Sequence, residues 1–251
     1  MKPLLSIKEG EVMVQTDHST KKLLTNLELT IYPEDFIVVL GGNGAGKSTL
    51  FNVLSGNLRL TAGDIVYQDQ SINHLSEEKR ATFLSRVFQD PKMGTAPRLT
   101  VSENLLFSKK RGEKRRFKRR KIKDYQQEFY DVTKSLGNHL ETHLDTPAGQ
   151  LSGGQRQSLS LLMATIRRPD LLLLDEHTAA LDPKTSEQLM AITNQKIQED
   201  KLTCLMITHH MEDALKYGNR LLVLKEGEIV ADFSEKEKEN LEKKDLLSFF
   251  Y

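Results

Sequence analysis

A glycine-rich loop between a strand-like run and a helix-like run constrains the fold of this chain more than any other feature. Residues 36–40 are a continuous apolar run, typical of a strand that is covered on both faces. Residues 41–48 match the pattern G-x-x-x-x-G-K-[ST], and apolar residues at helical spacing follow at residues 50–54. A strand, a glycine-rich loop and a helix in this order predict an α/β core that binds phosphate groups.

Each residue type in this loop has a physical role in holding a phosphate chain. The glycines let several backbone N–H groups point at one anion, and the following helix adds the positive end of its dipole. Lys47 supplies a point charge for the terminal phosphates, and the Ser48 hydroxyl supplies a ligand for Mg²⁺. A plain glycine turn between strand and helix has no need of lysine and serine at these positions. The expected contacts with the phosphate chain are Gly41, Gly42, Asn43, Gly44, Ala45, Gly46, Lys47, Ser48 and Thr49.

Further apolar runs indicate how the rest of the chain is organised. Buried strands are expected at residues 84–88, 171–174, 205–207 and 221–224, with helical stretches between several of them, which predicts a mostly parallel sheet. Strand candidates around Val12 and at residues 27–31 predict an antiparallel opening. We therefore expect an α/β fold with a P-loop NTPase core, an antiparallel β subdomain and an inserted α-helical subdomain. The predicted domains are an ATPase domain at 1–234, with core 1–89 and 156–234 and helical subdomain 90–155, and a charged C-terminal helix at 235–251.

Two carboxylates follow the most apolar strand candidate. Asp175 stands at the end of a run of four leucines, where the crevice of an open α/β sheet forms, so it is predicted to order Mg²⁺ or its water. Glu176 follows directly, and because successive residues leaving a strand face opposite ways, it is expected to point toward an attacking water. Without other motifs such a pair is more often a loop or helix cap.

A second phosphate-binding element, Leu-Ser-Gly-Gly-Gln at 151–155, identifies a family. With the loop at 41–48 and the acidic strand end, this segment resembles the ATPase subunits of ATP-binding cassette transporters. The resemblance covers nearly all of residues 4–230. It implies ATP and Mg²⁺ as cofactors and a head-to-tail homodimer in which Ser152, Gly153, Gly154 and Gln155 close over the nucleotide of the other copy.

The same resemblance assigns roles to residues that the pattern alone does not. Gln89 resembles the glutamine that contacts metal and water and senses the transport partner, and Glu176 takes the position of the general base. His209 resembles the switch histidine that holds the γ-phosphate and the attacking water, whereas His210 is expected to face solvent. Residues 180–182 resemble the loop that crosses to the other subunit. The implied catalytic set is Glu176, His209, Gln89 and Lys47, and the implied metal ligands are Ser48, Gln89 and Asp175.

The chain departs from the family pattern at three places. The family usually has proline after the glutamate and serine two residues further on, but this chain has His177 and Ala179, which alters the rigidity of the loop. The aromatic residue that stacks on adenine is also missing from its expected position. Alignment from the phosphate loop places His18 there, and Tyr32 is the other nearby aromatic, expected at a strand end.

Composition bounds the remaining function classes. The 36 Lys and Arg residues balance 35 Asp and Glu residues, which argues against a surface built throughout for nucleic acid. Cys204, the single cysteine, lies in an apolar run and excludes a disulfide framework within the chain and a cysteine zinc site. The apolar stretches are too short to span a bilayer, and the N-terminus does not resemble a secretory signal. We therefore expect a protein on the cytoplasmic face of the membrane, attached through permease subunits.

One strongly basic run remains unexplained. Residues 109–123 contain eleven Lys or Arg residues and one Glu. A solvated connector, a membrane-side or partner contact, and a nucleic-acid contact are the alternatives, the last disfavoured because aromatic stacking residues are scarce.

The sequence thus predicts a subunit that hydrolyses ATP to power uptake of a small solute, such as an amino acid and in particular an aromatic one like tryptophan. Expected partners are membrane-spanning permease subunits and an extracytoplasmic solute-binding protein, with no nucleic acid. The alternative is a soluble cassette ATPase that acts on nucleic acid or ribosomes.

Overall fold

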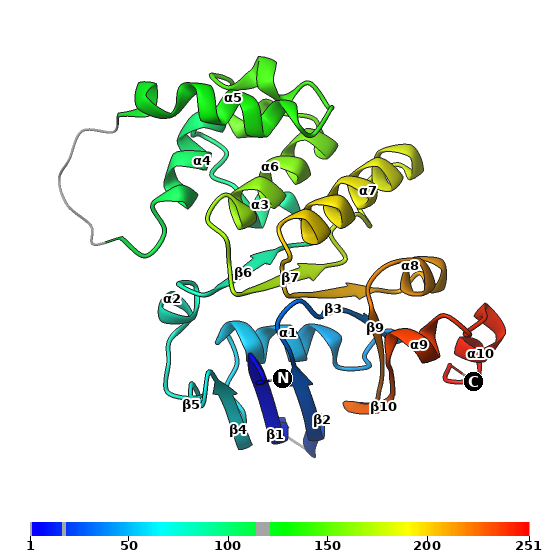
Figure 1. Cartoon of the computed structure of the whole chain (residues 1–251). Coiled ribbons are helices and arrows are strands. Elements are labelled where there is room, and N and C mark those ends of the chain that lie inside the picture. Colours follow the sequence, from blue (N-terminus) through cyan, green and yellow to red (C-terminus); the bar gives the residue numbers. More distant parts are fainter. Residues whose placement is uncertain (1, 17–18, 114–120, 251) are drawn as a thin grey trace. The chain divides into compact units, whose positions relative to one another are not determined.

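The computed structural model describes residues 2–16, 19–113 and 121–250, and the chain divides into two compact units (Figure 1). Unit 1 combines Met1–Arg80 with Lys201–Tyr251, and unit 2 is Ala81–Asp200. The phosphate loop and His209 belong to unit 1. Gln89, the two carboxylates and residues 151–155 belong to unit 2.

The first part of unit 1 is the predicted antiparallel β subdomain. Strands β1 (Leu5–Thr16) and β2 (Ser19–Ile31) form a hairpin, and β4 (Ala62–Tyr67) and β5 (Gln70–Ser71) extend the sheet in the order β2-β1-β4-β5. The hairpin is longer than predicted, because β1 and β2 stay paired out to Thr16 and Ser19. The outer half of β2 is exposed at successive positions, so it lacks the apolar alternation by which a strand is recognised in a sequence.

The phosphate loop follows the central strand of the second sheet region of unit 1. Strand β3 (Phe36–Leu40) lies between β8 (Cys204–Thr208) and β9 (Arg220–Lys225) and runs parallel to both. All five residues of β3 and of β8 are buried, which explains their unbroken apolar sequences. Strand β10 (Glu228–Phe233) pairs antiparallel with β9 and alternates between exposed and half-buried residues. Cys204 is fully buried in β8, as expected.

Helices complete unit 1. Helix α1 (Lys47–Ser55) follows the phosphate loop, α2 (Glu77–Arg80) ends the first segment, and α8 (Met211–Lys216) follows β8. The charged C-terminus forms two short helices, α9 (Glu235–Lys238) and α10 (Lys243–Leu247), in place of the single helix expected from its composition. Each begins with its own capping box, and Leu246 is fully buried, so two local start signals divide the segment.

Unit 2 consists of two parallel strands and a helical insertion between them. Strands β6 (Leu84–Val87) and β7 (Leu171–Asp175) pair in parallel, and α7 (Pro183–Glu199) follows β7. Between the strands lie α3 (Pro91–Gly94), α4 (Val101–Lys109), α5 (Gln126–Lys134), α6 (Gly153–Thr165) and the 3₁₀ turns η1 (Ile122–Tyr125), η2 (Leu140–His143) and η3 (Ala148–Gln150).

The helical insertion has its own apolar core. Fully buried residues of this core include Val101 and Leu105 from α4, Phe129 from α5, and Leu159 from α6. Burial of side chains of this size contributes about 2 kcal/mol each, so the insertion holds its shape through packing around α6. The predicted fold class, a P-loop α/β core with an antiparallel β subdomain and a helical insertion, is confirmed. Within the described ranges, no helix combines the length and apolar character that crossing a membrane requires.

Candidate functional site

The phosphate loop of unit 1 has the backbone conformation that its glycines allow. Gly44 and Gly46 have φ angles of 78° and 104°, in the left-handed region that residues with a Cβ rarely adopt. A Cβ on Gly46 would lie 3.0 Å from the Leu23 carbonyl oxygen, so a larger residue would also meet a tight steric contact. Helix α1 begins at Lys47 with Gly46 as its N-cap, and no side chain caps it. The start of α1 therefore presents backbone N–H groups at an exposed loop.

Lys47 is only 7% exposed and lies along its own loop. Its Nζ donates to the Gly41 carbonyl at 2.6 Å and to the Gly42 carbonyl at 3.0 Å. These bonds fix the ammonium group close to the backbone that would surround a phosphate.

The loop fits the phosphate chain of Mg-ATP. A Cβ built on Gly44 meets no atom within 4 Å, so the loop leaves open space beside its backbone, and Ser48 is exposed in the first turn of α1. No group of three or more His, Cys, Asp or Glu residues in the described part of the chain could form a metal cage. Mg²⁺ usually binds through few protein oxygens together with substrate phosphates, which a hydroxyl such as that of Ser48 would suit.

His209 leaves the sheet at the same edge as the phosphate loop. Because β8 and β3 are parallel and Leu40 pairs with Thr208, Gly41 and His209 follow neighbouring positions. His209 and His210 are both exposed, and their rings lie 4.1 Å apart between centroids. The His210 N–H donates to the Thr208 hydroxyl at 3.1 Å, and His210 is the N-cap of α8.

In unit 2, Gln89 and the two carboxylates leave a shared edge as well. Val87 pairs with Leu174 in the parallel register, so Gln89, two residues after β6, and Asp175, the last residue of β7, lie at the same end of these strands. Asp175 forms an ion pair with Arg86, in which the two side chains are 15% and 11% exposed. The sequence does not predict Arg86 as a site residue, because a single arginine inside an apolar strand forms no motif.

Glu176 does not continue the strand. Its φ is 42°, so the alternation of side chains along β7 no longer sets its direction, and the argument from alternation does not apply to it. A turn follows, in which the Ala179 N–H donates to the Glu176 carbonyl at 2.9 Å. Asp182 then caps α7 by accepting from the Thr185 N–H at 3.1 Å, and hydrogen bonds from Thr185 lower the pKa of Asp182.

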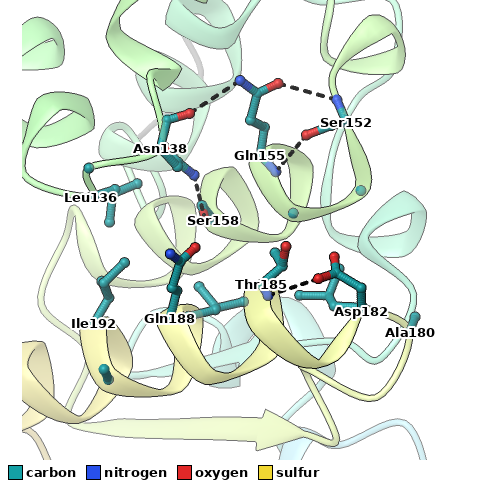
Figure 2. A pocket seen from close by; sticks show the side chains of 16 residues that line it. Leu136, Asn138, Ser152, Gln155, Ser158, Ala180, Asp182, Thr185, Gln188 and Ile192 are labelled. Carbon is teal, nitrogen blue, oxygen red and sulfur yellow. Dashed lines mark hydrogen bonds between the residues drawn. The ribbon is translucent and has the colours of Figure 1, made fainter.

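The segment 151–155 is the start of helix α6 and forms a capping box. The Ser152 hydroxyl accepts from the Gln155 N–H, and the Gln155 side-chain oxygen accepts from the Ser152 N–H, both at 3.3 Å (Figure 2). Ser152 and Gly153 are exposed. Because the Ser152 oxygen acts as acceptor in the cap, its own proton can still donate to an anion.

This helix start lines an open pocket of about 600 Å³ within unit 2. Figure 2 shows the residues of α6 on one side and Thr185, Gln188 and Ile192 of α7 on the other. Asn138 supports the α6 start, because its carbonyl accepts from Gln155 at 3.3 Å and its amide donates to Ser158 at 2.9 Å. The pocket is lined by Leu136, Gly137, Asn138, Ser152, Gly153, Gly154, Gln155, Ser158, Ala180, Leu181, Asp182, Thr185, Gln188, Leu189, Ala191 and Ile192.

Two features of the sequence analysis fall wholly or partly outside the described residues. His18, the candidate for adenine stacking, lies outside them, and Tyr32 follows the last residue of β2, at the strand end as expected. Residues 114–120 of the basic run also lie outside. Of its described members, Lys109 forms an ion pair with Glu128 at 2.6 Å, and Arg111 hydrogen-bonds to Ser85.

Comparison with known proteins finds relatives that match most of the chain. The ABC transporter family matches residues 24–179. A tyrosine transport ATP-binding protein of Clostridioides difficile is 42% identical over 91% of this chain and 90% of its own length. A phosphonates import ATP-binding protein of Oceanobacillus iheyensis is 33% identical over 84% of each chain.

Solved structures agree in fold. The dimeric ATP-binding cassette MJ0796 bound to ADP and Pi superposes with a TM-score of 0.79, at 26% identity, over 92% of this chain and 98% of that one. The cbiO1 protein of Clostridium perfringens, part of an ABC transporter complex, has a TM-score of 0.78 at 25% identity over 99% and 94% of the two chains.

Proposed function

The chain belongs to the ABC transporter family and is an ATPase that hydrolyses ATP for transport, and we propose that its transporter takes up an amino acid. The ATPase activity fits a chain that holds a phosphate loop at the start of α1 and a second exposed helix start, with a capping box, at α6 beside an open pocket. The relative named for tyrosine transport, at 42% identity over nearly the whole chain, supports an amino acid as cargo, with aromatic amino acids first.

Each residue of the site has a separate role in ATP hydrolysis. Lys47 and the N–H groups of residues 41–49 bind the phosphates, and Ser48, Asp175 and Gln89 are the residues that would hold Mg²⁺. When bound there, the ion would supply positive charge beside the phosphates. Glu176 accepts the proton of the attacking water, and His209 holds that water and the γ-phosphate in line. Because Asp175 is paired with Arg86 in this structure, its carboxylate is already oriented by a cation.

Two copies would assemble head to tail for hydrolysis. We assign Ser152, Gly153, Gly154 and Gln155 to the nucleotide held by the second copy, where the α6 dipole and the Ser152 proton would meet the γ-phosphate. The known dimeric cassette with bound ADP and Pi supports this assembly. His18 remains the candidate for adenine contact, and the division into core and helical subdomain at residues 90 and 155 stays a prediction.

The assembly predicts that two inactive variants rescue each other. Lys47→Ala removes phosphate binding in its own copy, and Ser152→Arg blocks the nucleotide of the other copy. A mixed dimer contains one site with intact Lys47 and intact Ser152, so mixing should restore part of the ATPase rate. Full activity of Ser152→Arg alone, together with no ATP-dependent dimer of Glu176→Gln in light scattering, would refute the shared site.

The transport proposal places the chain at the cytoplasmic face of a membrane with permease subunits and an extracytoplasmic binding protein. The test is the ATPase rate of the complex reconstituted in proteoliposomes with the permease and binding protein encoded by neighbouring genes. Tyrosine, tryptophan or phenylalanine should stimulate hydrolysis several-fold, while spermidine and phosphonate serve as controls. Stimulation by a control alone would overturn the amino-acid proposal, and co-purification with nucleic acid in place of a membrane protein would favour the soluble alternative.

A further inference from the structure

His177 stands directly after Glu176 and is buried in unit 2. Its side chain is 2% exposed, and the ring Nε2 lies 3.2 Å from the Thr193 hydroxyl oxygen in the middle of α7. The proline that the family usually has at this position could form no such bond, because its side chain carries neither donor nor acceptor.

The hydrogen-bond network fixes which ring nitrogen carries the proton. The Thr193 hydroxyl donates its single proton to the Leu189 carbonyl at 2.7 Å. Toward His177 the hydroxyl can therefore act only as an acceptor, and Nε2 of His177 must be the donor. A buried donor that is satisfied by one named partner is costly to leave unpaired, so the bond ties the loop to α7.

The loop that carries Glu176 is attached to α7 at both ends. His177 binds Thr193 in the middle of the helix, and Asp182 caps the helix start through the Thr185 N–H. Glu176 has a positive φ, which costs a residue with a Cβ roughly 1 kcal/mol and persists only where neighbouring contacts hold it. Within the loop, the Leu181 N–H donates to the Thr178 carbonyl at 3.1 Å, so the segment contains a further hydrogen-bonded turn.

Helix α7 also borders the pocket at the start of α6. Thr185, Gln188, Leu189 and Ile192 line that pocket opposite Ser152–Gln155, as Figure 2 shows for Thr185, Gln188 and Ile192. Leu189, whose carbonyl accepts from Thr193, is therefore both a wall of the pocket and part of the His177 network. One helix positions the loop of Glu176 and one side of this pocket.

We propose that His177 is a positioning residue for hydrolysis: its hydrogen bond to Thr193 holds the Glu176 backbone and the loop 180–182 in fixed places on α7. The proposal rests on the proposed role of Glu176 as the base. His177 touches no reacting atom, so its loss should slow hydrolysis while nucleotide binding to the phosphate loop of unit 1 is retained.

Three substitutions separate the hydrogen bond from the packing. Thr193→Val keeps the shape but removes the acceptor, and it leaves the buried His177 donor unsatisfied. His177→Leu removes the donor at similar bulk, and His177→Gln keeps an N–H donor near the Nε2 position. The double variant His177→Leu/Thr193→Val removes both polar groups and should regain stability relative to Thr193→Val, because no buried donor is left unpaired.

The expected results concern turnover, affinity and stability together. We expect single-turnover hydrolysis to fall about tenfold in His177→Leu, in Thr193→Val and in the double variant, with ATP affinity by calorimetry unchanged. The double variant should lose no more than either single variant, because the residues act as a pair. His177→Gln should recover most of the rate. The control is Thr133→Val, which removes a buried hydroxyl that bonds the Phe129 carbonyl on α5 and should leave turnover unchanged.

The outcomes distinguish this proposal from the role of Glu176. If the double variant unfolds at the wild-type temperature and hydrolyses ATP at the wild-type rate while Glu176→Gln is stalled, the positioning role of His177 is wrong and the base stands. If Glu176→Gln itself turns over normally, the proposed function of that residue fails first. A rate lost in Thr133→Val to the same extent would show a general packing effect and would also overturn the proposal.

Discussion

The loop after β3 and the loop after β7 acquire their shapes in different ways. The phosphate loop after β3 depends on residue type, since Gly44 and Gly46 supply positive φ angles and a Cβ on Gly46 would be in tight contact with the Leu23 carbonyl. The loop after β7 has a positive φ at Glu176, which is not a glycine, and is held by His177 and Asp182 through contacts with α7. A loop shape that depends on residue type can be predicted from adjacent residues. A loop shape that depends on contacts with a distant helix cannot.

The largest expected effects come from removing one charged side chain in each loop, Glu176 after β7 and Lys47 after β3. Glu176→Gln should leave ATP binding intact and slow phosphate release by about a thousandfold, because it removes the proton acceptor and nothing else. Lys47→Ala should weaken binding and turnover together, because the 7% exposed ammonium is fixed on the loop that receives phosphate. Calorimetry and steady-state phosphate release would measure both. Near-native turnover of Glu176→Gln would remove that residue as the base.

A smaller effect tests whether the phosphate loop is encoded by its glycines. Gly46→Ala should destabilise the fold by about 2 kcal/mol and weaken ATP binding, because the new Cβ meets the Leu23 carbonyl at 3.0 Å at a φ of 104°. Gly44→Ala is the matched control, since it also has a positive φ but its Cβ meets nothing within 4 Å. Thermal unfolding should show the larger loss for Gly46→Ala. Equal losses would mean that backbone conformation alone, and no steric contact, sets the effect.

The last prediction concerns a contact in unit 1 that also joins residues distant in sequence. Lys238 of α9 donates to the carbonyls of Tyr217 and Gly218, and burial lowers its pKa to about 8. The unfolded chain binds this proton more tightly than the folded chain between pH 8 and 10.5. Stability should therefore rise with pH in that window, by at most about 1.4 kcal/mol per pH unit from this group.

The measurement is chemical denaturation of wild type and Lys238→Met at several pH values from 7 to 10.5. The variant should lack this part of the pH dependence, while the slope contributed by other groups remains. Two parallel curves would show that the folded chain holds the Lys238 proton as tightly as the unfolded chain does.

The fold could be predicted well from the sequence wherever burial on both faces produced an unbroken apolar run. Strands β3, β7, β8 and β9 were found for this reason. Strand β10 was missed because it alternates between exposed and half-buried residues, and the short β5 because its two residues are exposed. The C-terminal helix pair was missed because composition indicates a solvated helix but not where a second capping box starts a new one.

The candidate site shows the same limit. Contiguous patterns in the sequence indicate Lys47, Asp175 and the segment 151–155 as candidate site residues. They could not indicate Arg86 beside Asp175, or Thr193 beneath His177, since these partners come from other elements and form no pattern. His177 was noticed only as a departure, and its physical role required the position of α7.

The buried thiol of Cys204 makes the chain suited to site-specific labelling. It is the single cysteine of the sequence, it is fully buried in β8, and burial raises the pKa of its thiol. Maleimide reagents attack the thiolate, so the native thiol should stay unreactive while the protein is folded. A cysteine introduced at exposed Lys236 in unit 1, or at exposed Lys184 in unit 2, would then be the one reactive group. Fluorescent probes could follow each unit's response to nucleotide with the native thiol left in place.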